Sequence, residues 1–327
     1  ILKSDIIAKP IFKEKTYLKA GAVGYWAGRF TSQIVTTRNY SGSSYGPKTM
    51  TEIWCFFGKT EVPSKENGGF MANSCYIKAK DSYILIDTGA NYNFAKQAYE
   101  AMQKIEDLKV STIIITHEHD DHWMGNSFYK DRFNSTIYAP KSINENYNEN
   151  SKPRIFEILD KNEMENTKVI KADVVVSDEK VINISDKTIK IIPTKLTAHT
   201  KDDLIVYLPD EKVIFTGDII MNQRVTSNRD GSVIGTLKAI DLINSYDWNT
   251  LIAGHGTITD KKATDFTTKY FTLLKTRVLE AIEAGITADE ISKVVTMDDF
   301  KDIAMFDELN SRNVFDAFRE LEFYDEE

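Results

Sequence analysis

The sequence is poor in cysteine and histidine and has no long apolar run. Its 327 residues include two cysteines and five histidines. No stretch approaches the roughly 18 uncharged apolar residues of a membrane-spanning helix, so we expect no membrane span. Lys and Arg number 41 against 49 Asp and Glu, which gives a formal net charge of −8. Because phosphate backbones are bound by basic surfaces, this balance disfavours a nucleic-acid partner. We expect a small-molecule substrate.

The two cysteines, Cys55 and Cys75, are too far apart to form a C-x-x-C pair. They could form one disulfide in an oxidising compartment, but we expect two buried thiols. The chain begins with Ile1 rather than methionine, as it would after removal of a secretory signal or if the sequence were truncated. A periplasmic or secreted location is therefore slightly favoured over a cytoplasmic one. Nothing in the sequence indicates an oligomeric state.

Apolar content of 42% and charged content of 28% are typical of a soluble globular protein. Residues 1–50 contain a Gly/Ser/Tyr cluster at 40–46 and are expected to form a loop-rich lead-in. Residues 51–258 carry most of the strand-like runs and are expected to form the main domain. Residues 259–327 show helical stripes and are expected to form a helical extension packed on it.

Short apolar runs separated by turn residues predict strands in the main domain. They lie at 53–57, 73–77, 83–86, 110–116, 181–184, 189–192, 204–208, 213–215 and 251–253. Apolar residues at helical spacing predict helices at 94–105, 266–282 and 314–321. Strands that alternate with a few helices predict a layered α/β protein.

All five histidines lie in segments suited to binding metal. Three belong to His117-Glu118-His119-Asp120-Asp121-His122, directly after a predicted strand; the others are His199 and His255. On a loop leaving a strand, His117 and His119 can point toward one metal, while Asp121 and His122 can face a second. Asp218 follows another strand and could bridge the two. Imidazole and carboxylate are the ligands of zinc, and seven of them suffice for a two-metal site.

These motifs, in this order, resemble those of the metallo-β-lactamase-fold hydrolase superfamily, and particularly its hydroxyacylglutathione-hydrolase-like and bacterial members. The resemblance spans residues 85–256 and includes an upstream aspartate. The motifs that carry it are Leu85-Ile86-Asp87-Thr88-Gly89, His117-x-His119-x-Asp121-His122, His199, Thr216-Gly217-Asp218 and Gly254-His255-Gly256. It implies an αββα sandwich with the metals at one edge, followed here by the helical extension.

The resemblance also implies roles for these residues. One metal would be held by His117, His119 and His199. The other would be held by Asp121, His122 and His255, with Asp218 bridging and Asp87 supporting the ligands from behind. Asp121 would also orient the attacking water. Two Zn²⁺ ions are the expected cofactors, with iron or manganese as alternatives.

The implied activity is hydrolysis, in which a hydroxide shared by the metals attacks the carbonyl of an ester, thioester or β-lactam-like cyclic amide. One alternative is a persulfide-dioxygenase-like oxidoreductase that uses a single iron. A second is a metal-binding protein of the same fold without catalysis. The sequence does not choose the substrate, because loops shape the pocket.

Four residues near the motifs are candidates for contact with substrate. Trp123 follows the histidine cluster and could narrow the pocket or stack on a substrate, or pack in the core instead. Arg224, Asn228 and Arg229 follow Asp218 and could bind an anionic group, although solvated charge is the commoner explanation.

Overall fold

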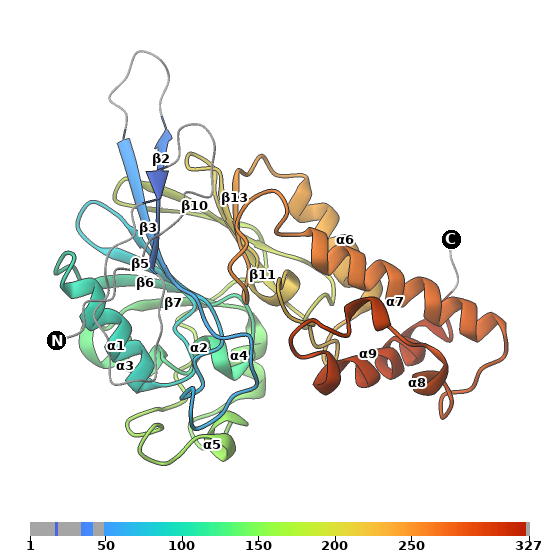
Figure 1. The fold of residues 1–327 in the computed structure, drawn as a ribbon. Helices are drawn as coiled ribbons and strands as arrows, with labels where there is room; N and C mark the ends of the chain where they lie inside the picture. Colours follow the sequence, from blue (N-terminus) through green and yellow to red (C-terminus); the bar gives the residue numbers. More distant parts are fainter. Residues whose placement is uncertain (1–16, 19–33, 42–48, 325–327) are drawn as a thin grey trace, which may run out of the picture.

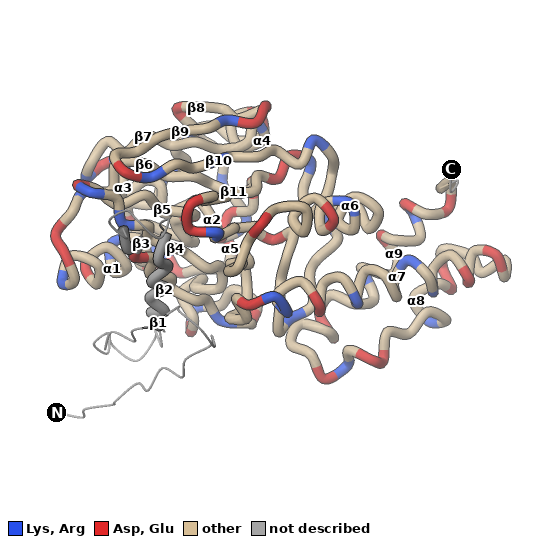
Figure 2. Tube along the Cα trace, turned by 90° about the horizontal axis from the view of Figure 1, so that it is seen from above, with Lys and Arg blue, Asp and Glu red and all other residues tan. Residues whose placement is uncertain are grey.

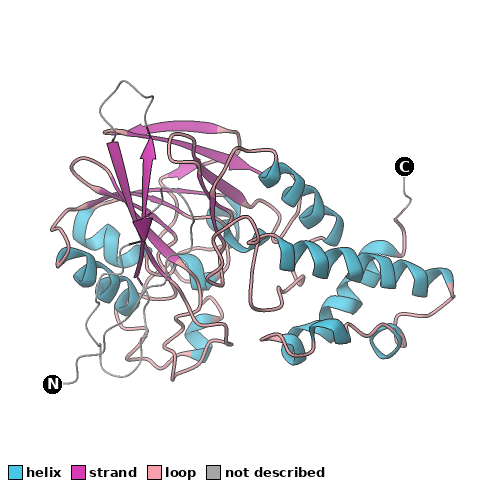
Figure 3. Ribbon diagram, turned by 45° about the horizontal axis from the view of Figure 1, so that its top comes forward, coloured by secondary structure: helices cyan, strands magenta, loops and turns pink. Residues whose placement is uncertain are grey.

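The computed structural model describes residues 17–18, 34–41 and 49–324. Two β-sheets lie face to face, and helices cover the outer face of each (Figures 1 and 3). Further helices follow at the C-terminal end of the described chain and project to one side of the sandwich. The expectation of an αββα sandwich with a helical C-terminal extension is confirmed.

Among the described residues, the first sheet contains eight strands in sequence order. Neighbours are antiparallel from β1 to β5 and parallel from β5 to β8. The strands are β1 (Tyr17–Leu18), β2 (Ile34–Ser41), β3 (Thr49–Phe56), β4 (Ser74–Lys78), β5 (Tyr83–Ile86), β6 (Val110–Ile114), β7 (Thr136–Ala139) and β8 (Val174–Val175).

The second sheet has five strands in the order β13-β12-β11-β10-β9, and only the β12–β13 pair is parallel. Its strands are β9 (Lys180–Ile184), β10 (Lys187–Pro193), β11 (Leu204–Leu208), β12 (Val213–Phe215) and β13 (Thr250–Ile252). Every residue of β11, β12 and β13 is buried, which explains why all of them except Thr250 are apolar or aromatic.

Three apolar cores hold the layers together. One lies between the sheets and includes Ile84, Ile191 and Val206. A second packs α1 (Tyr92–Gln103) and α3 (Asn126–Phe133) on the first sheet, and a third packs α6 (Val233–Asn244) on the second. The start of α1 is fixed by Asn91, whose side chain accepts a hydrogen bond from the amide of Phe94 at 2.7 Å.

Short helical segments occupy the connections, including several near the ends of the strands. They are α2 (Asp120–Trp123), α4 (Lys141–Asn146), α5 (Ile155–Ile158) and the 3-10 turn η1 (Gly217–Ile219). The extension contains α7 (Asp265–Glu283), α8 (Ile291–Val294), the 3-10 turn η2 (Asp298–Phe300) and α9 (Phe306–Leu321), which share a core of their own. The two helical stripes predicted there correspond to α7 and α9.

Two expectations require correction. The lead-in is not loop-rich over Ile34–Ser41, because this segment is strand β2 and pairs with β3 along all eight residues. Most of its Gly/Ser/Tyr cluster, residues 42–46, lies outside the described residues. The cysteines are not separate thiols either. Cys55 and Cys75 are directly opposite each other on β3 and β4, with Cα atoms 4.1 Å apart, and form a disulfide.

Charge is dispersed over the described chain. Lys and Arg are interspersed with Asp and Glu along the trace (Figure 2). Among the described residues, none of the helices combines the length and apolar character that a bilayer crossing requires.

Candidate metal centre

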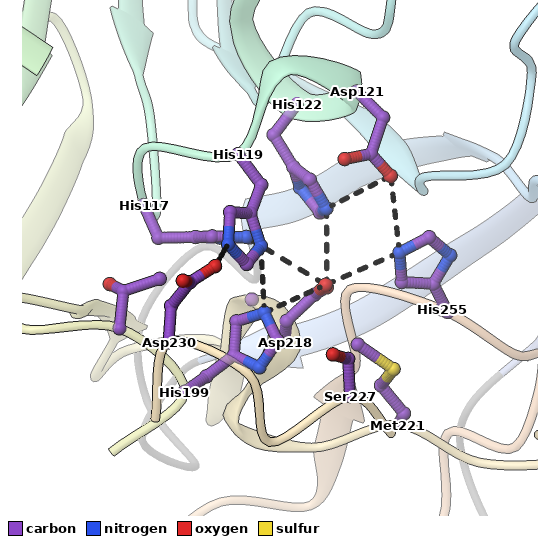
Figure 4. Close-up of polar contacts among 12 residues, drawn as sticks. His117, His119, Asp121, His122, His199, Asp218, Met221, Ser227, Asp230 and His255 are labelled. Carbon is purple, nitrogen blue, oxygen red and sulfur yellow. Dashed lines mark hydrogen bonds and ion pairs between the residues drawn. The ribbon is translucent and has the colours of Figure 1, made fainter. Parts of the chain in front are cut away.

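The candidate ligands come from four loops that meet at one edge of the sandwich. His117 and His119 lie between β6 and α2, and Asp121 and His122 lie in α2 itself. His199 follows β10, Asp218 lies in η1 after β12, and His255 follows β13. Each ligand segment therefore follows a buried strand whose end is held by its sheet. Figure 4 shows the seven side chains converging from these loops.

The side chains form two neighbouring groups. His117, His119, His199 and Asp218 make one, and Asp121, His122 and His255 make the other; within each group, potential ligand atoms lie within 4.8 Å of one another. Asp218 lies between the groups. Its Oδ2 is 3.4 Å from Nε2 of His199 and 3.3 Å from Nε2 of His255, while its Oδ1 is 3.2 Å from Nε2 of His122. This is the position that a bridging carboxylate requires.

The chemistry of these groups fits divalent metal. Nε2 of His117, Nε2 of His122 and Oδ1 of Asp218 are buried without a hydrogen-bond partner. Buried polar atoms are normally paired, so unpaired ligand-type atoms within these two groups fit missing partners of positive charge. Imidazole nitrogen and carboxylate oxygen suit zinc, and also iron or manganese.

Electrostatics favour the same interpretation. Burial lowers the pKa of His117 well below its usual value and lowers that of His199 to about 3, so both rings are neutral, as ligands must be. Burial also opposes charge on His122, but the carboxylates of Asp218, Asp121 and Asp87 outweigh it and raise the pKa of His122. The carboxylates that stabilise a proton there would equally stabilise a metal cation.

Asp87 holds His122 from behind, as the family resemblance implied. Its Oδ2 lies 2.8 Å from Nδ1 of His122. Thr116 donates to the same carboxylate from its backbone amide and from its hydroxyl, both at 2.8 Å. Asp87 has φ of 53°, an unfavourable conformation for a residue other than glycine. Such strain at a fully hydrogen-bonded carboxylate indicates a functional constraint.

The His255 turn is fixed by the segment before β4. Nδ1 of His255 lies 2.8 Å from the carbonyl oxygen of Met71. The side-chain amide of Asn73 donates to the carbonyls of Ala253 and Gly256, at 2.9 and 2.8 Å. Gly254 is required by close approach, because a Cβ there would lie 1.9 Å from Oδ1 of Asp218. Sequence reasoning missed Asn73, which no motif marks.

His119 has a partner that sequence reasoning also missed. Its Nε2 lies 3.0 Å from Oδ2 of Asp230, and its Nδ1 lies 2.9 Å from Nε2 of His199. Arg229 binds the same carboxylate oxygen of Asp230. Asp230 is 111 residues from His119. No periodic or motif signal connects positions so far apart.

A cavity of about 270 Å³ opens over the two groups. Its apolar wall combines the main domain and the extension: Val62, Met71, Met221, Met305 and Leu309. Arg224 and Arg229 line it as expected of anion-binding candidates. Trp123 and Asn228 do not line it. Trp123 is fully buried and its indole donates to the carbonyl of Glu118, so it belongs to the core.

The chain matches the sequence model of the family described as the metallo-beta-lactamase superfamily over residues 67–255, more than half of its length. It is 29% identical to a hydroxyacylglutathione hydrolase of Brucella anthropi over 123 residues, 38% of each protein. It is also 29% identical to the probable metallo-hydrolase YybB of Bacillus subtilis over 153 residues, which covers 46% of this chain and 62% of that protein. The chain thus spans less than two thirds of the length of these relatives.

Solved structures agree with the fold. A metallo-beta-lactamase from Pontibacter korlensis superposes with a TM-score of 0.51 at 16% identity, over 78% of this chain and 99% of that one. The sec-alkylsulfatase Pisa1 from a Pseudomonas species superposes with a TM-score of 0.57 at 17% identity, over 83% of this chain and 49% of that one. At such identities the likeness concerns the fold alone.

Proposed function

Because the chain belongs to the metallo-β-lactamase superfamily, we propose that it is a metal-dependent hydrolase with two divalent ions, zinc first among them. Its substrate is a small molecule with a carbonyl that water can attack: an ester, a thioester or a β-lactam-like cyclic amide. The observation that carries this proposal is the convergence of seven ligand-type side chains, all buried except the half-buried His119, into two adjoining groups. Named relatives that are hydrolases support it.

We assign His117, His119 and His199 to one metal and Asp121, His122 and His255 to the other, with Asp218 between them. Bound metal supplies Lewis acidity and lowers the pKa of a water. We propose that Asp121 orients that water; its Oδ2 lies 3.4 Å from Nε2 of His255 and 3.8 Å from Nε2 of His122, the residues assigned to the second metal. Asp87 keeps Nε2 of His122 directed into the site by holding Nδ1.

The substrate is further proposed to carry an anionic group, which Arg224 binds. Arg224 is only 7% exposed, yet no carboxylate of the described residues forms an ion pair with it. A buried cation on the wall of a cavity is costly unless it meets a partner of opposite charge. Burial lowers the pKa of Arg224, and Asp218, Asp121 and Glu308 oppose this shift. Asp218 and Asp121 point into the candidate metal groups (Figure 4).

The disulfide supports a proposal about location. Disulfides persist in oxidising compartments and are rare in the cytosol. The Cys55–Cys75 bond therefore favours a periplasmic or secreted protein.

The test is metal quantification on gently purified protein, coupled to a panel of thioesters, lactones, β-lactams, phosphodiesters and persulfides. We expect two zinc ions per chain and turnover of a carbonyl substrate. His119→Ala and Asp218→Ala should each remove at least one metal and lower turnover by about 100-fold or more. Asp210→Asn, an exposed carboxylate between β11 and β12, is the matched control.

Two results would overturn the proposal. One iron per chain with oxygen uptake on a persulfide identifies a dioxygenase. Protein that binds no metal even when zinc is supplied, and has no turnover, is a non-catalytic member of the fold.

A further inference from the structure

The ring of His119 is oriented differently from the other candidate ligands. His117, His122, His199 and His255 all direct Nε2 toward the carboxylates of the site. On the opposite side of their rings, Nδ1 of His122 contacts Asp87 and Nδ1 of His255 contacts a backbone carbonyl. His119 instead directs Nδ1 at His199, because its Nε2 faces Asp230. Figure 4 shows Asp230 behind the ring of His119, outside the ligand cluster.

We propose that Asp230 is a positioning residue that makes Nδ1 the metal-facing atom of His119, and that the helical extension holds Asp230 in place through Asn313. This inference rests on the proposed metal site. It gives the extension a function in metal binding beyond packing on the main domain.

The carboxylate of Asp230 is suited to this role. Its Oδ2 is 3.0 Å from Nε2 of His119, 2.8 Å from Nε of Arg229 and 2.7 Å from an Nη of the same arginine. A carboxylate only accepts hydrogen bonds, so the proton of neutral His119 must lie on Nε2. Nδ1 is then left with a free lone pair, which a metal ion needs.

Asp230 belongs to a short segment, residues 226–231, which we call the Asp230 loop. Asn313 of α9 anchors it. The side-chain amide of Asn313 donates to the carbonyl of Thr226 at 2.6 Å, and its Oδ1 accepts from the amide of Asn228 at 2.9 Å. Asn313 is 1% exposed, and Tyr270 of α7 contacts it at 3.0 Å. The loop is thus joined to two helices of the extension.

The other side of the Asp230 loop rests on the His199 segment. A Cβ at Gly231 would lie 2.4 Å from the carbonyl oxygen of Ala198 and 2.9 Å from that of His199. Directly after the loop, the amide of Ser232 donates to the carbonyl of Ala198 at 2.8 Å. Glu320 of α9 accepts from the amides of Val233 and Ile234 at 2.7 and 3.1 Å. Between these contacts the loop has a fixed position over His119.

The two metal shells therefore depend on different parts of the chain. His122 and His255 are held by Asp87 and Met71 of the main domain. His119 is held by Asp230, whose loop the extension anchors. A hydrogen bond weakens steeply when its geometry is lost. Disturbing the Asp230 loop should therefore weaken metal binding by the shell that contains His119 and leave the shell of His122 and His255 unchanged.

The experiment measures zinc affinity by chelator competition and uses Co²⁺ absorbance to tell the two shells apart. The variants are Asp230→Ala, Asp230→Asn and Asn313→Ala. Asp230→Ala should lower the affinity for one metal by about 10- to 100-fold, which is the usual effect of removing the hydrogen-bond partner of a metal ligand. Asp230→Asn keeps a hydrogen-bond acceptor for His119 and should lose less metal affinity. Asn313→Ala should weaken the same metal as Asp230→Ala, because the loop is no longer anchored.

Arg312→Gln is the matched control, since Arg312 lies beside Asn313 on α9 with its side chain 62% exposed. Melting of each variant in chelator checks that it folds. The side chain of Asp230 is 42% exposed, so its variants should fold and keep the test valid if Asn313→Ala unfolds.

Wild-type protein that binds two metals, with Asp230→Ala binding both equally well, overturns this inference and leaves the proposed function intact. Equal weakening of both metals also overturns it, because that is the effect of general loosening. Wild-type protein that binds no metal overturns the proposed function and this inference together.

Discussion

The guanidinium of Arg224 lies against the ring of His255, with Nη1 3.4 Å from Nδ1. That nitrogen is also 2.8 Å from the carbonyl oxygen of Met71, to which it must donate, so it has no lone pair for Arg224. The guanidinium also donates from Nε to the carbonyl of Val225, but this hydrogen bond is long at 3.4 Å. Arg224 is thus a buried cation at the cavity, near Glu308 but without an ion pair to any carboxylate of the described residues.

The first prediction concerns this cation. Arg224→Gln should raise KM for anionic substrates by about 10- to 100-fold, since hydrogen bonds to charged groups contribute about 1.5–3 kcal/mol. kcat should change much less, because the contact exists before and during reaction. The measurement is steady-state kinetics on a matched pair of substrates, one with a carboxylate and one with its methyl ester. An equal loss on both substrates would assign Arg224 to the structure of the site instead.

The second prediction concerns Asp87, which accepts from Thr116 twice and from His122. Asp87→Asn replaces one accepting carboxylate oxygen by a donating NH₂ group. This group must then face a donor of Thr116 or His122 in a buried place. We expect metal affinity to fall by about 10- to 100-fold, with the larger effect on the shell that contains His122. Chelator competition measures the metal affinity of each variant. Asp81→Asn, an exposed carboxylate on the turn between β4 and β5, serves as control. Unchanged affinity would remove Asp87 from the support of the site.

The candidate ligand set could be predicted from the sequence because its chemistry is local. Three histidines and an aspartate of this set lie within six residues, and the other candidate ligands each follow a short buried strand. Strand ends determine where such residues meet, so a correct strand assignment brings them together. Asp87 was found in the same way.

Partners that depend on long-range packing were not predictable. Asp230 reaches His119 only because α9 holds its loop there, and Asn73 reaches the His255 turn across 180 residues. The pairing of Cys55 with Cys75 depends on the register of β3 with β4, which no residue pattern near either cysteine specifies. Strand β2 could not be predicted, because polar residues occupy positions 36–39 and a Gly/Ser cluster follows it, so no apolar run marks it.

The third prediction concerns the disulfide. Cys55 and Cys75 close a segment with a sequence separation of 20. Cross-linking a loop of this size typically stabilises a fold by about 3 kcal/mol, mainly by restricting the unfolded chain. The Cys55→Ala/Cys75→Ala protein should lose about that much free energy of unfolding in urea titration. Mass spectrometry after alkylation under denaturing conditions should find no free thiol in the wild-type protein. Two alkylated thiols there would contradict the pairing.

The fourth prediction concerns Asp203, a buried carboxyl that accepts from the amide and hydroxyl of Thr200 at 2.9 and 2.8 Å. Burial raises its pKa to about 7, whereas an unfolded aspartate titrates near 3.9. The folded state therefore holds this proton more tightly. The contribution of this raised pKa to the free energy of unfolding is fully present below about pH 4 and is lost as the pH rises through 7. The loss is at most about 1.4 kcal/mol per pH unit.

Asp203→Asn removes this titration while keeping an acceptor for Thr200. Between pH 5 and 7, its free energy of unfolding should therefore fall less steeply with pH than that of the wild-type protein. Urea titrations of both proteins at pH 5, 6 and 7 in one buffer series measure the two slopes. The remaining titratable groups, including the five histidines, are common to both proteins, so the difference in slope isolates Asp203. Coincident slopes would show that Asp203 ionises in the folded protein as it does in the unfolded chain.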